Sequence, residues 1–223
     1  MDKRGTHTWD EVIKLIAETV SQEMTEGVSP AGSSFSIPVE VSNRHCHLRQ
    51  VTFELLYGQG RQLTPMRHLS QPGEFASQEK VVVVGSGMRV LEGVRIIGPF
   101  REYDQVELSH TDGYALDLAL PVRLSGDIAD TQPITLVGPV GVVTLKEGAI
   151  RAARHIHVNI ADVGRYQVKN GQKVDVEVAG PGGVIFKEVI VRISPNGKLA
   201  CHLDTDEGNA AGIRGTGFCR ILC

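Results

Sequence analysis

The sequence lacks a hydrophobic run of about 18 residues, the length that a membrane-spanning helix requires. Hydrophobic residues nevertheless make up 41% of its 223 residues, which is enough for a folded core. The sequence also lacks a strong charge of either sign, because 26 acidic residues face 23 basic ones. A protein that neutralises nucleic-acid phosphates is expected to be basic. These absences predict a soluble globular protein whose partners include neither a membrane nor a nucleic acid.

Two further kinds of pattern are missing. The four cysteines do not have the spacing of a disulfide framework: Cys46, Cys201, Cys219 and Cys223. The start of the chain lacks the charged and then apolar layout of a secretory signal, so we expect a cytoplasmic protein with reduced thiols. Neither a Walker A nor a G-x-G-x-x-G motif is present, and we do not expect a nucleotide site of those kinds.

The first 36 residues differ in pattern from the rest of the chain. Apolar side chains recur there at the spacing of one helix face: Trp9, Ile13, Ile16, Val20 and Met24. Thr8 and Glu11 have the spacing of a capping box, which marks the start of a helix. Residues 27–36 are small and polar with one proline, as in a flexible linker. We therefore predict an amphipathic targeting helix in 1–26 and a linker in 27–36.

From residue 37 onward, short apolar stretches alternate with turn residues. This pattern predicts a mainly β fold of barrels or sandwiches, because a parallel sheet would need a helix between strand pairs. We expect strands at 81–84, 134–136, 142–145, 174–178 and 184–193, and short helices near 50–57 and 160–167. Asn196-Gly197 is predicted to begin a further hairpin.

A repeated motif divides this part of the chain. Residues 44–48 read RHCHL and residues 154–158 read RHIHV, so the two copies lie 110 residues apart. A second repeat supports the first, because ELSHTD at 107–112 is similar to HLDTD at 202–206. We therefore predict two similar β-rich units, 37–133 and 134–223.

The repeated H-x-H pattern indicates a metal site. Side chains at i and i+2 of a strand lie on one face, so each motif provides two neighbouring imidazoles, which zinc binds well. One such pair is also typical of an exposed strand or of a core histidine, and it is the repetition that favours a metal. Four histidines exceed the need of one open zinc site, and the second repeat adds one candidate ligand to each pair. The count fits two metals, with six candidate ligands: His45, His47, Glu107, His155, His157 and His202.

The remaining candidates have weaker patterns. His7, His68 and His110 lie outside any paired spacing, and we expect them to be surface or structural residues. Cys46 lies between the two histidines of its motif and should point to the opposite strand face. Arg101 follows a Gly-Pro turn six residues before Glu107, where a guanidinium can hold a phosphate or carboxylate. A plain surface arginine is the alternative there.

Six motifs, in this order and spacing, closely resemble those of the phosphate propanoyltransferases, a family of phosphotransacylases. They are SNRHCHL, LSQPGEF, GPFREYDQVELS, PVRLSG, RHIHV and HLDTDEGNAAG. The resemblance covers the chain from about residue 37 to its end. It implies two β-barrel domains with a two-zinc site between them, and the conversion of an acyl-CoA and phosphate to acyl phosphate and CoA. The acyl group would be short, as in propanoyl-CoA or acetyl-CoA.

The resemblance also assigns roles to residues. It implies that one zinc binds His45, His47 and Glu107, and that the other binds His155, His157 and His202. Arg101 matches the arginine that binds phosphate in the family. Four further residues fall in motifs that line the pocket: Ser42, Gln71, Ser125 and Asn209. Cys46 is a departure, because the family usually has an aliphatic residue there.

The resemblance further implies a location and an assembly. Many members of the family work in the lumen of a bacterial microcompartment, and the helix predicted in 1–26 would then bind the shell or other cargo. Its docking on its own barrel or on a sister subunit is the alternative. We also expect a homo-oligomer.

Two other functions fit the predicted ligands. In a metal-dependent hydrolase, a metal-bound water would replace phosphate as the nucleophile. In a non-catalytic shell or scaffold protein, the zinc ions would be structural, which favours closed four-ligand sites. Six ligands shared by two metals leave open positions, and this favours catalysis.

Overall fold

The computed structural model describes residues 37–180 and 182–222. These residues belong to the compact unit Ser36–Cys223, and Met1–Phe35 form a separate unit. The predicted helix in 1–26 and linker in 27–36 therefore lie outside the described residues. Within the described part of the chain, no helix combines the length and the apolar character that crossing a bilayer requires.

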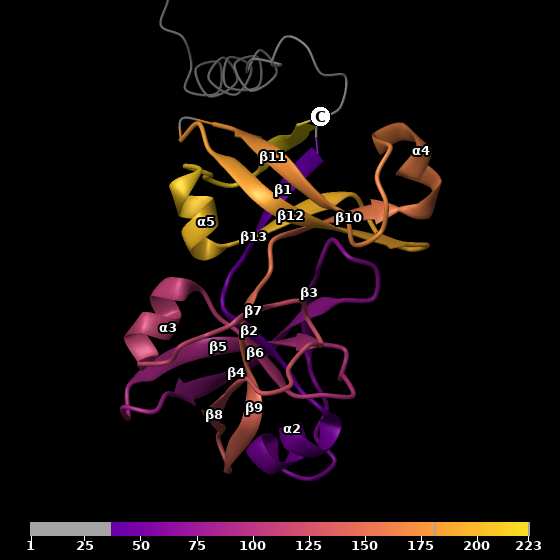
Figure 1. Cartoon of the computed structure of the whole chain (residues 1–223). Helices are drawn as coiled ribbons and strands as arrows, with labels where there is room; N and C mark the ends of the chain where they lie inside the picture. Colours follow the sequence, from indigo (N-terminus) through magenta and orange to yellow (C-terminus); the bar gives the residue numbers. More distant parts are fainter. Residues whose placement is uncertain (1–36, 181, 223) are drawn as a thin grey trace, which may run out of the picture. The chain divides into compact units, whose positions relative to one another are not determined.

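The predicted mainly β fold with two barrels is confirmed (Figure 1). Six strands close the first barrel, which we call barrel 1: β2 (His45–His47), β4 (Phe75–Val84), β5 (Val90–Gly98), β6 (Gln105–Glu107), β8 (Gln132–Val137) and β9 (Val142–Ala152). They pair in the ring order β4, β5, β2, β6, β9 and β8, and β8 pairs again with β4. Two short strands extend the ring, because β3 (Pro65–His68) pairs with β4 and β7 (Val122–Arg123) pairs with β9.

Barrel 2 has the same number of strands in its ring. These are β1 (Ile37–Ser42), β10 (His155–Asn159), β11 (Lys173–Ala179), β12 (Ile185–Ser194), β13 (Ala200–Asp204) and β14 (Gly217–Leu222). Their ring order is β1, β13, β10, β12, β11 and β14. The strands β12 and β13 lie on opposite sides of β10, so the hairpin predicted at Asn196-Gly197 is wrong. The turn there instead carries the chain past β10.

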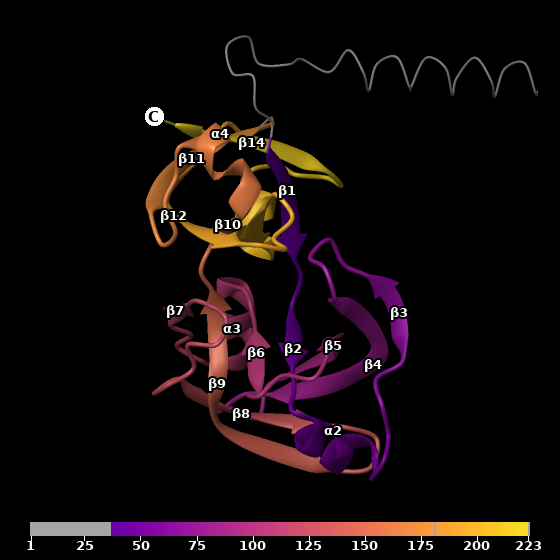
Figure 2. The same cartoon turned by 90° about the vertical axis from the view of Figure 1, so that its right-hand side faces the viewer.

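The strand pairing divides the chain differently from the boundary expected at 133/134. β1 lies in barrel 2, where it pairs in parallel with β13, and β8 and β9 lie in barrel 1. The chain therefore passes between the barrels twice, at 43–44 and at 153–154, as Figure 2 shows. Each H-x-H strand begins immediately after one of these crossings. The crossings thus place both motifs at the junction of the barrels.

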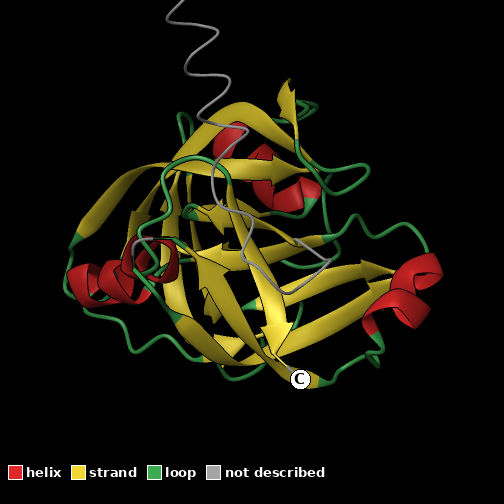
Figure 3. Cartoon of the chain, turned by 90° about the horizontal axis from the view of Figure 1, so that it is seen from above, coloured by secondary structure: helices red, strands yellow, loops and turns green. Residues whose placement is uncertain are grey.

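Short helices accompany the strands in the view from above, two of them at the edges of the picture (Figure 3). The predicted helices are confirmed as α2 (Gln50–Tyr57) and as η1 (Ile160–Asp162) followed by α4 (Val163–Tyr166). The other two were not expected, and each follows one of the predicted third ligands: α3 (His110–Leu116) and α5 (Thr205–Ala210). Both begin with a capping box, formed by Ser109 with Asp112 and by Asp204 with Glu207.

Each barrel has its own hydrophobic core. In β11 the buried side chains alternate with polar ones, because Val174, Val176 and Val178 face inward. Cys46 is fully buried in the core of barrel 1, on the strand face opposite to its neighbouring histidines, as expected. Each of the two H-x-H strands is therefore held in place by the core of its own barrel.

Candidate active site

The first candidate metal site, which we call site 1, joins β2 and β6. His45 and His47 lie on one face of β2, and Glu107 pairs directly opposite His45. Nε2 of His45 lies 3.5 Å from Oε2 of Glu107, and Nε2 of His47 lies 3.9 Å from Oε1. Three ligand atoms of these residues lie within 4.8 Å of one another. Two imidazoles and a carboxylate with this spacing could hold one divalent metal.

Site 2 repeats this arrangement with a histidine in place of the glutamate. His155 and His157 lie on one face of β10, and His202 on β13 pairs directly opposite His155. The Nε2 atoms of His155 and His157 are 3.1 Å apart. The ring of His202 lies 5.0 Å from that of His155 and 4.8 Å from that of His157, measured between centroids. Three nitrogens that converge in this way suit zinc, which binds imidazole well.

Backbone carbonyls orient the first histidine of each motif. Nδ1 of His45 lies 2.8 Å from the carbonyl oxygen of Asn43, and Nδ1 of His155 lies 2.8 Å from that of Ala153. A carbonyl only accepts, so Nδ1 carries the proton in both rings and Nε2 keeps its lone pair. This is how a metal-binding histidine is usually held. The two crossings between the barrels thus supply an equivalent carbonyl to each site.

Burial keeps several of the histidines neutral. Burial, and then the charge of His45, lowers the pKa of His47 well below its usual value. Burial has the same effect on the pKa of His155. Burial, and then the charge of His202, lowers the pKa of His157 to about 4. Neutral imidazole is the form that binds a metal, so these pKa shifts fit both sites to a cation.

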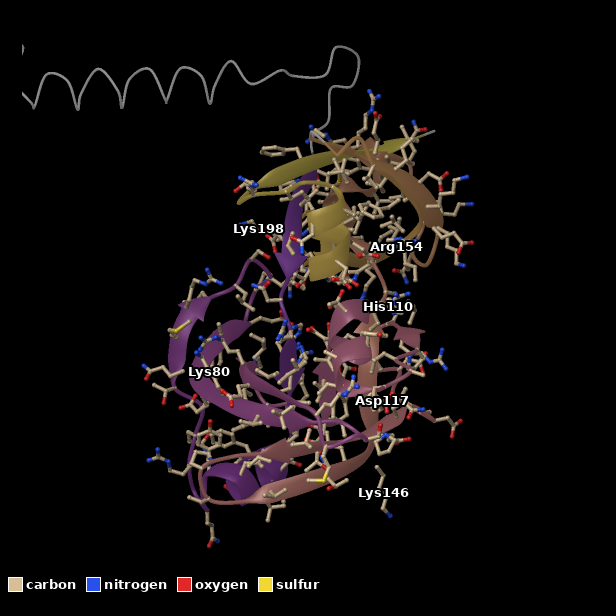
Figure 4. The ribbon with its side chains drawn as sticks, turned by 90° about the vertical axis from the view of Figure 1, so that its left-hand side faces the viewer. Lys80, His110, Asp117, Lys146, Arg154 and Lys198 are labelled. Carbon is tan, nitrogen blue, oxygen red and sulfur yellow. The ribbon has the colours of Figure 1, made fainter. Side chains whose placement is uncertain are left out.

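An arginine before each H-x-H motif reaches the helix that follows the third ligand. Nη2 of Arg44 lies 2.8 Å from Oδ1 of Asp112, at the start of α3. In barrel 2, Nη1 of Arg154 lies 2.7 Å from Oε1 of Glu207, at the start of α5. Figure 4 labels Arg154 on barrel 2 and His110, the first residue of α3, on barrel 1. The two sites thus share both their ligand layout and the support around it.

A second layer of hydrogen bonds holds Glu107. Nε2 of Gln105 donates to Oε1 of Glu107 at 2.6 Å and to Oγ of Ser125 at 2.9 Å. The backbone N–H of Gly126 donates to Oε1 of Gln105 at 2.8 Å. The predicted pocket residue Ser125 therefore contacts the carboxylate of site 1 through Gln105. Sequence analysis missed Gln105, although its position two residues before Glu107 places both on one strand face.

One cavity of about 710 Å³ opens between the barrels and is lined by all six candidate ligands. Four of the other predicted residues also line it: Ser42, Gln71, Arg101 and Ser125. Asn209 is exposed on α5 and is not part of the lining. The preceding Gly208 packs against β1, where an added Cβ would lie 2.6 Å from Cγ2 of Val41. His68, expected to be a surface or structural residue, is exposed on β3 and lines the cavity.

Arg101 lies next to site 1. Its backbone N–H donates to the carbonyl of Leu48 at 2.9 Å, directly after β2. Its Nη2 forms an ion pair with Glu74, which sequence analysis did not identify. Its buried Nε has no hydrogen-bond partner among the described residues. A buried donor of this kind can bind an anion in the cavity.

The loop between β3 and β4 connects the barrels at the cavity. Gln71 donates from Nε2 to the carbonyl of Lys198 at 3.0 Å and accepts from the N–H of Lys198 at 3.2 Å. Oγ of Ser70 donates to Oε2 of Glu40 at 2.5 Å. That carboxylate oxygen also lies 3.3 Å from Nε2 of His202. Glu40 is thus a further cavity residue, and it was missed because its spacing relates it to no repeated motif.

The two cysteines next to candidate ligands, Cys46 and Cys201, are poorly placed for catalysis. Cys46 and Cys201 are fully buried, and neither lines the cavity. Burial raises the pKa of the Cys46 thiol far above its usual value. A hydrogen bond with Cys219, and then burial, raises the pKa of Cys201. Both are therefore protonated thiols, which are weak nucleophiles.

The family model described as phosphate propanoyltransferase matches residues 38–214. A phosphate propanoyltransferase of Listeria monocytogenes is 45% identical over 178 residues, covering 80% of this chain and 83% of the relative. One from Thermotoga maritima is 44% identical over 198 residues, covering 88% and 94%. One from Planctopirus limnophila is 40% identical over 211 residues, covering 91% and 86%.

Proposed function

The chain belongs to the phosphate propanoyltransferase family, and from this premise we propose that it transfers a short acyl group between coenzyme A and phosphate at a two-zinc site. It is an enzyme of the phosphate acyltransferase class, with acyl-CoA and phosphate as substrates. The proposal names propanoyl-CoA or acetyl-CoA as the acyl donor. The observation that carries it is the pair of ligand groups that line one cavity beside Arg101.

The two sites would hold the two zinc ions. His45, His47 and Glu107 would bind one, and His155, His157 and His202 would bind the other. Three ligands for each ion leave coordination positions open, as in catalytic zinc sites. When bound, the zinc ions supply positive charge that can polarise a thioester carbonyl and stabilise a thiolate. The carbonyls of Asn43 and Ala153 keep the histidine Nε2 atoms available for this purpose.

The proposed reaction needs no external oxidant or reductant. An oxygen of hydrogen phosphate attacks the carbonyl carbon of the thioester, a C–O bond forms and the C–S bond breaks. The electron pair of the C–S bond leaves with the sulfur, which takes up the proton of hydrogen phosphate. Acyl phosphate and free CoA are the products. Binding both substrates in one cavity makes the attack effectively intramolecular.

Arg101 is the proposed phosphate ligand on barrel 1. Its unpartnered Nε and its guanidinium fork fit a phosphate oxygen pair. Glu74 would share the guanidinium with the incoming anion or give way to it. Ser42 and Gln71 line the same cavity, and Gln71 also keeps the β3–β4 loop on barrel 2. No cysteine is needed as an acyl carrier.

The cellular setting is part of the proposal. We place the enzyme in the lumen of a bacterial microcompartment, with residues 1–26 as the segment that binds the shell or other cargo. The support is the amphipathic pattern of that segment and the linker composition of 27–36. A homo-oligomer is proposed on the same basis, because the apolar face needs a partner to cover it.

The test measures both products of one reaction mixture. The purified full chain, with its zinc content determined, is given acetyl-, propanoyl- or butanoyl-CoA with and without phosphate. CoA thiol and acyl phosphate should appear in equal amounts, and only when phosphate is present. A chelator should abolish the transfer, and added zinc should restore at least part of it. CoA release without phosphate would instead indicate a hydrolase, and full activity of metal-free protein would contradict the two-zinc site.

A further inference from the structure

Arg192 lies on barrel 2 beside site 2. It pairs in register with His157 in the parallel pair of β10 and β12. Residues paired in this way lie on the same face of a sheet, so both side chains face the cavity. Arg192 is half-buried and belongs to the cavity lining. Its charge is also one of the causes, after burial and His202, that lower the pKa of His157.

No carboxylate neutralises Arg192 within the described part of the chain. The structure gives it no ion pair, whereas Arg44 is paired with Asp112 and Arg101 with Glu74. Two other arginines line the cavity, and both differ from Arg192. Arg95 is engaged, because it donates to the carbonyl of Ser77 at 2.5 Å, whereas Arg67 is exposed to solvent on β3.

Each of the acidic residues that line the cavity is engaged elsewhere. Glu40 binds Ser70, and Glu107 binds Gln105. Asp204 is held in the capping box of α5, and Glu74 is the partner of Arg101. Partial burial of a guanidinium that has no carboxylate partner costs free energy, and an anion that binds from solution would offset this cost.

We propose that Arg192 is a second phosphate-binding residue, which binds a phosphate group of a substrate from barrel 2 while Arg101 binds the inorganic phosphate from barrel 1. This rests on the proposed function, because that function brings phosphate groups into the cavity. The guanidinium fork matches two phosphate oxygens. The phosphate group could belong to inorganic phosphate or to coenzyme A. The two sources share this chemistry, and binding measurements separate them.

The test compares four forms of the zinc-loaded full chain: wild type, Arg192→Gln, Arg192→Lys and Arg214→Gln. Arg214 is exposed in the same unit, outside the cavity lining, so its substitution controls for the loss of one positive charge. Isothermal titration with inorganic phosphate and, separately, with CoA gives a dissociation constant for each source. Zinc content and thermal unfolding are measured on the same samples.

Arg192→Gln should weaken the binding of one ligand by roughly tenfold or more, as expected for a lost charge-assisted hydrogen bond. The other ligand, the zinc content and the Arg214→Gln control should stay within about twofold of wild type by the same scale. Weaker phosphate binding would assign Arg192 to the attacking anion, and weaker CoA binding would assign it to the nucleotide. Arg192→Lys should recover only part of the affinity, since lysine keeps the charge and loses the fork.

The proposal is overturned if both dissociation constants of Arg192→Gln match wild type. If that variant does not fold, unchanged constants in Arg192→Lys overturn it equally. The readout is binding without turnover, so it is separate from the test of the proposed function. A chain that transfers no acyl group but loses phosphate affinity with Arg192→Gln would contradict the reaction and keep the binding residue.

Discussion

Arg154 joins the strand that carries His155 and His157 to Glu207, the third residue of α5, with an Nη1 to Oε1 distance of 2.7 Å. α5 follows β13 directly, so this ion pair connects the ends of the two strands that supply the ligands of site 2. Glu207 is the more buried partner, and its other carboxylate oxygen accepts from the N–H of Asp204 at 3.1 Å. Arg44 and Asp112 connect the equivalent elements of site 1.

The first prediction is that Arg154→Lys weakens metal binding at site 2. Outer residues that orient ligands typically contribute about tenfold or more to metal affinity. We therefore expect about a tenfold loss of zinc affinity for one of two ions, measured by competition with a chromophoric chelator. Arg220→Lys is the matched control, because both arginine side chains are 34% exposed and Arg220 pairs with Glu177 outside the cavity. Equal zinc affinity in both variants would contradict the prediction and show that Arg154 does not orient the ligands of site 2.

The repeat made these sites predictable from sequence. An H-x-H pattern places both imidazoles on one face in any strand, so His45 and His47 needed no long-range information. The second repeat then suggested Glu107 and His202, which do lie opposite the first histidine of each motif. Strand pairing is a long-range property, and for that reason the sequence did not reveal that β1 belongs to barrel 2 and that β8 and β9 belong to barrel 1.

Other features left too little pattern to be found. α3 and α5 are too short for a helical period to show in the sequence. Glu40 and Arg192 reach the cavity because the barrels meet there, and nothing in their neighbouring residues marks them. Glu74 lies in the motif LSQPGEF, but the resemblance gave it no role of its own. Asn209 shows the opposite limit, since a residue that falls in a motif next to a ligand can still lie outside the cavity lining.

The second prediction concerns the ligands themselves. His45→Ala and His157→Ala should each lower the zinc content by about one ion per chain and reduce the transfer rate by at least about a hundredfold, because each removes a ligand from a site of three. Zinc is measured by elemental mass spectrometry, and the rate by CoA thiol release. His110→Ala should leave both unchanged, since His110 lies outside the cavity lining. Retention of both ions in His157→Ala would remove this residue from the ligand set.

The third prediction tests Arg101 by kinetics. Arg101→Ala should raise the KM for phosphate and lower kcat, because the residue would bind the anion both before and during the attack. We expect about a tenfold or larger loss in kcat/KM for phosphate, with little change in the KM for acyl-CoA. Arg101→Lys should rescue poorly, since it lacks the planar fork. A phosphate dependence equal to that of wild type would exclude Arg101 from the phosphate site.

The fourth prediction is that no cysteine forms an acyl intermediate. Cys46→Ala and Cys201→Ala should keep near wild-type rates and lose about 1 kcal/mol of stability, as is typical of a small core substitution. Their raised pKa values also predict slow alkylation by iodoacetamide in the folded protein, followed by peptide mass spectrometry. An acyl adduct on either thiol during turnover would contradict direct attack by phosphate.

The last prediction separates the catalytic fold from residues 1–33. All six candidate ligands, Arg101 and both barrels lie within Ser36–Cys223, so removing 1–33 takes away none of these residues. We expect the truncated chain to keep its specific activity and zinc content, to self-associate less in sedimentation experiments, and to separate from the microcompartment. Replacing Ile13 and Ile16 by Glu should have the same effect, because charge on the apolar face of the predicted helix opposes docking. Exchanging Glu11 and Glu18 for Gln is a suitable control, since these residues lie on the predicted polar face. Loss of zinc or unfolding of the truncated chain would make residues 1–33 part of the catalytic fold and contradict the addressing role.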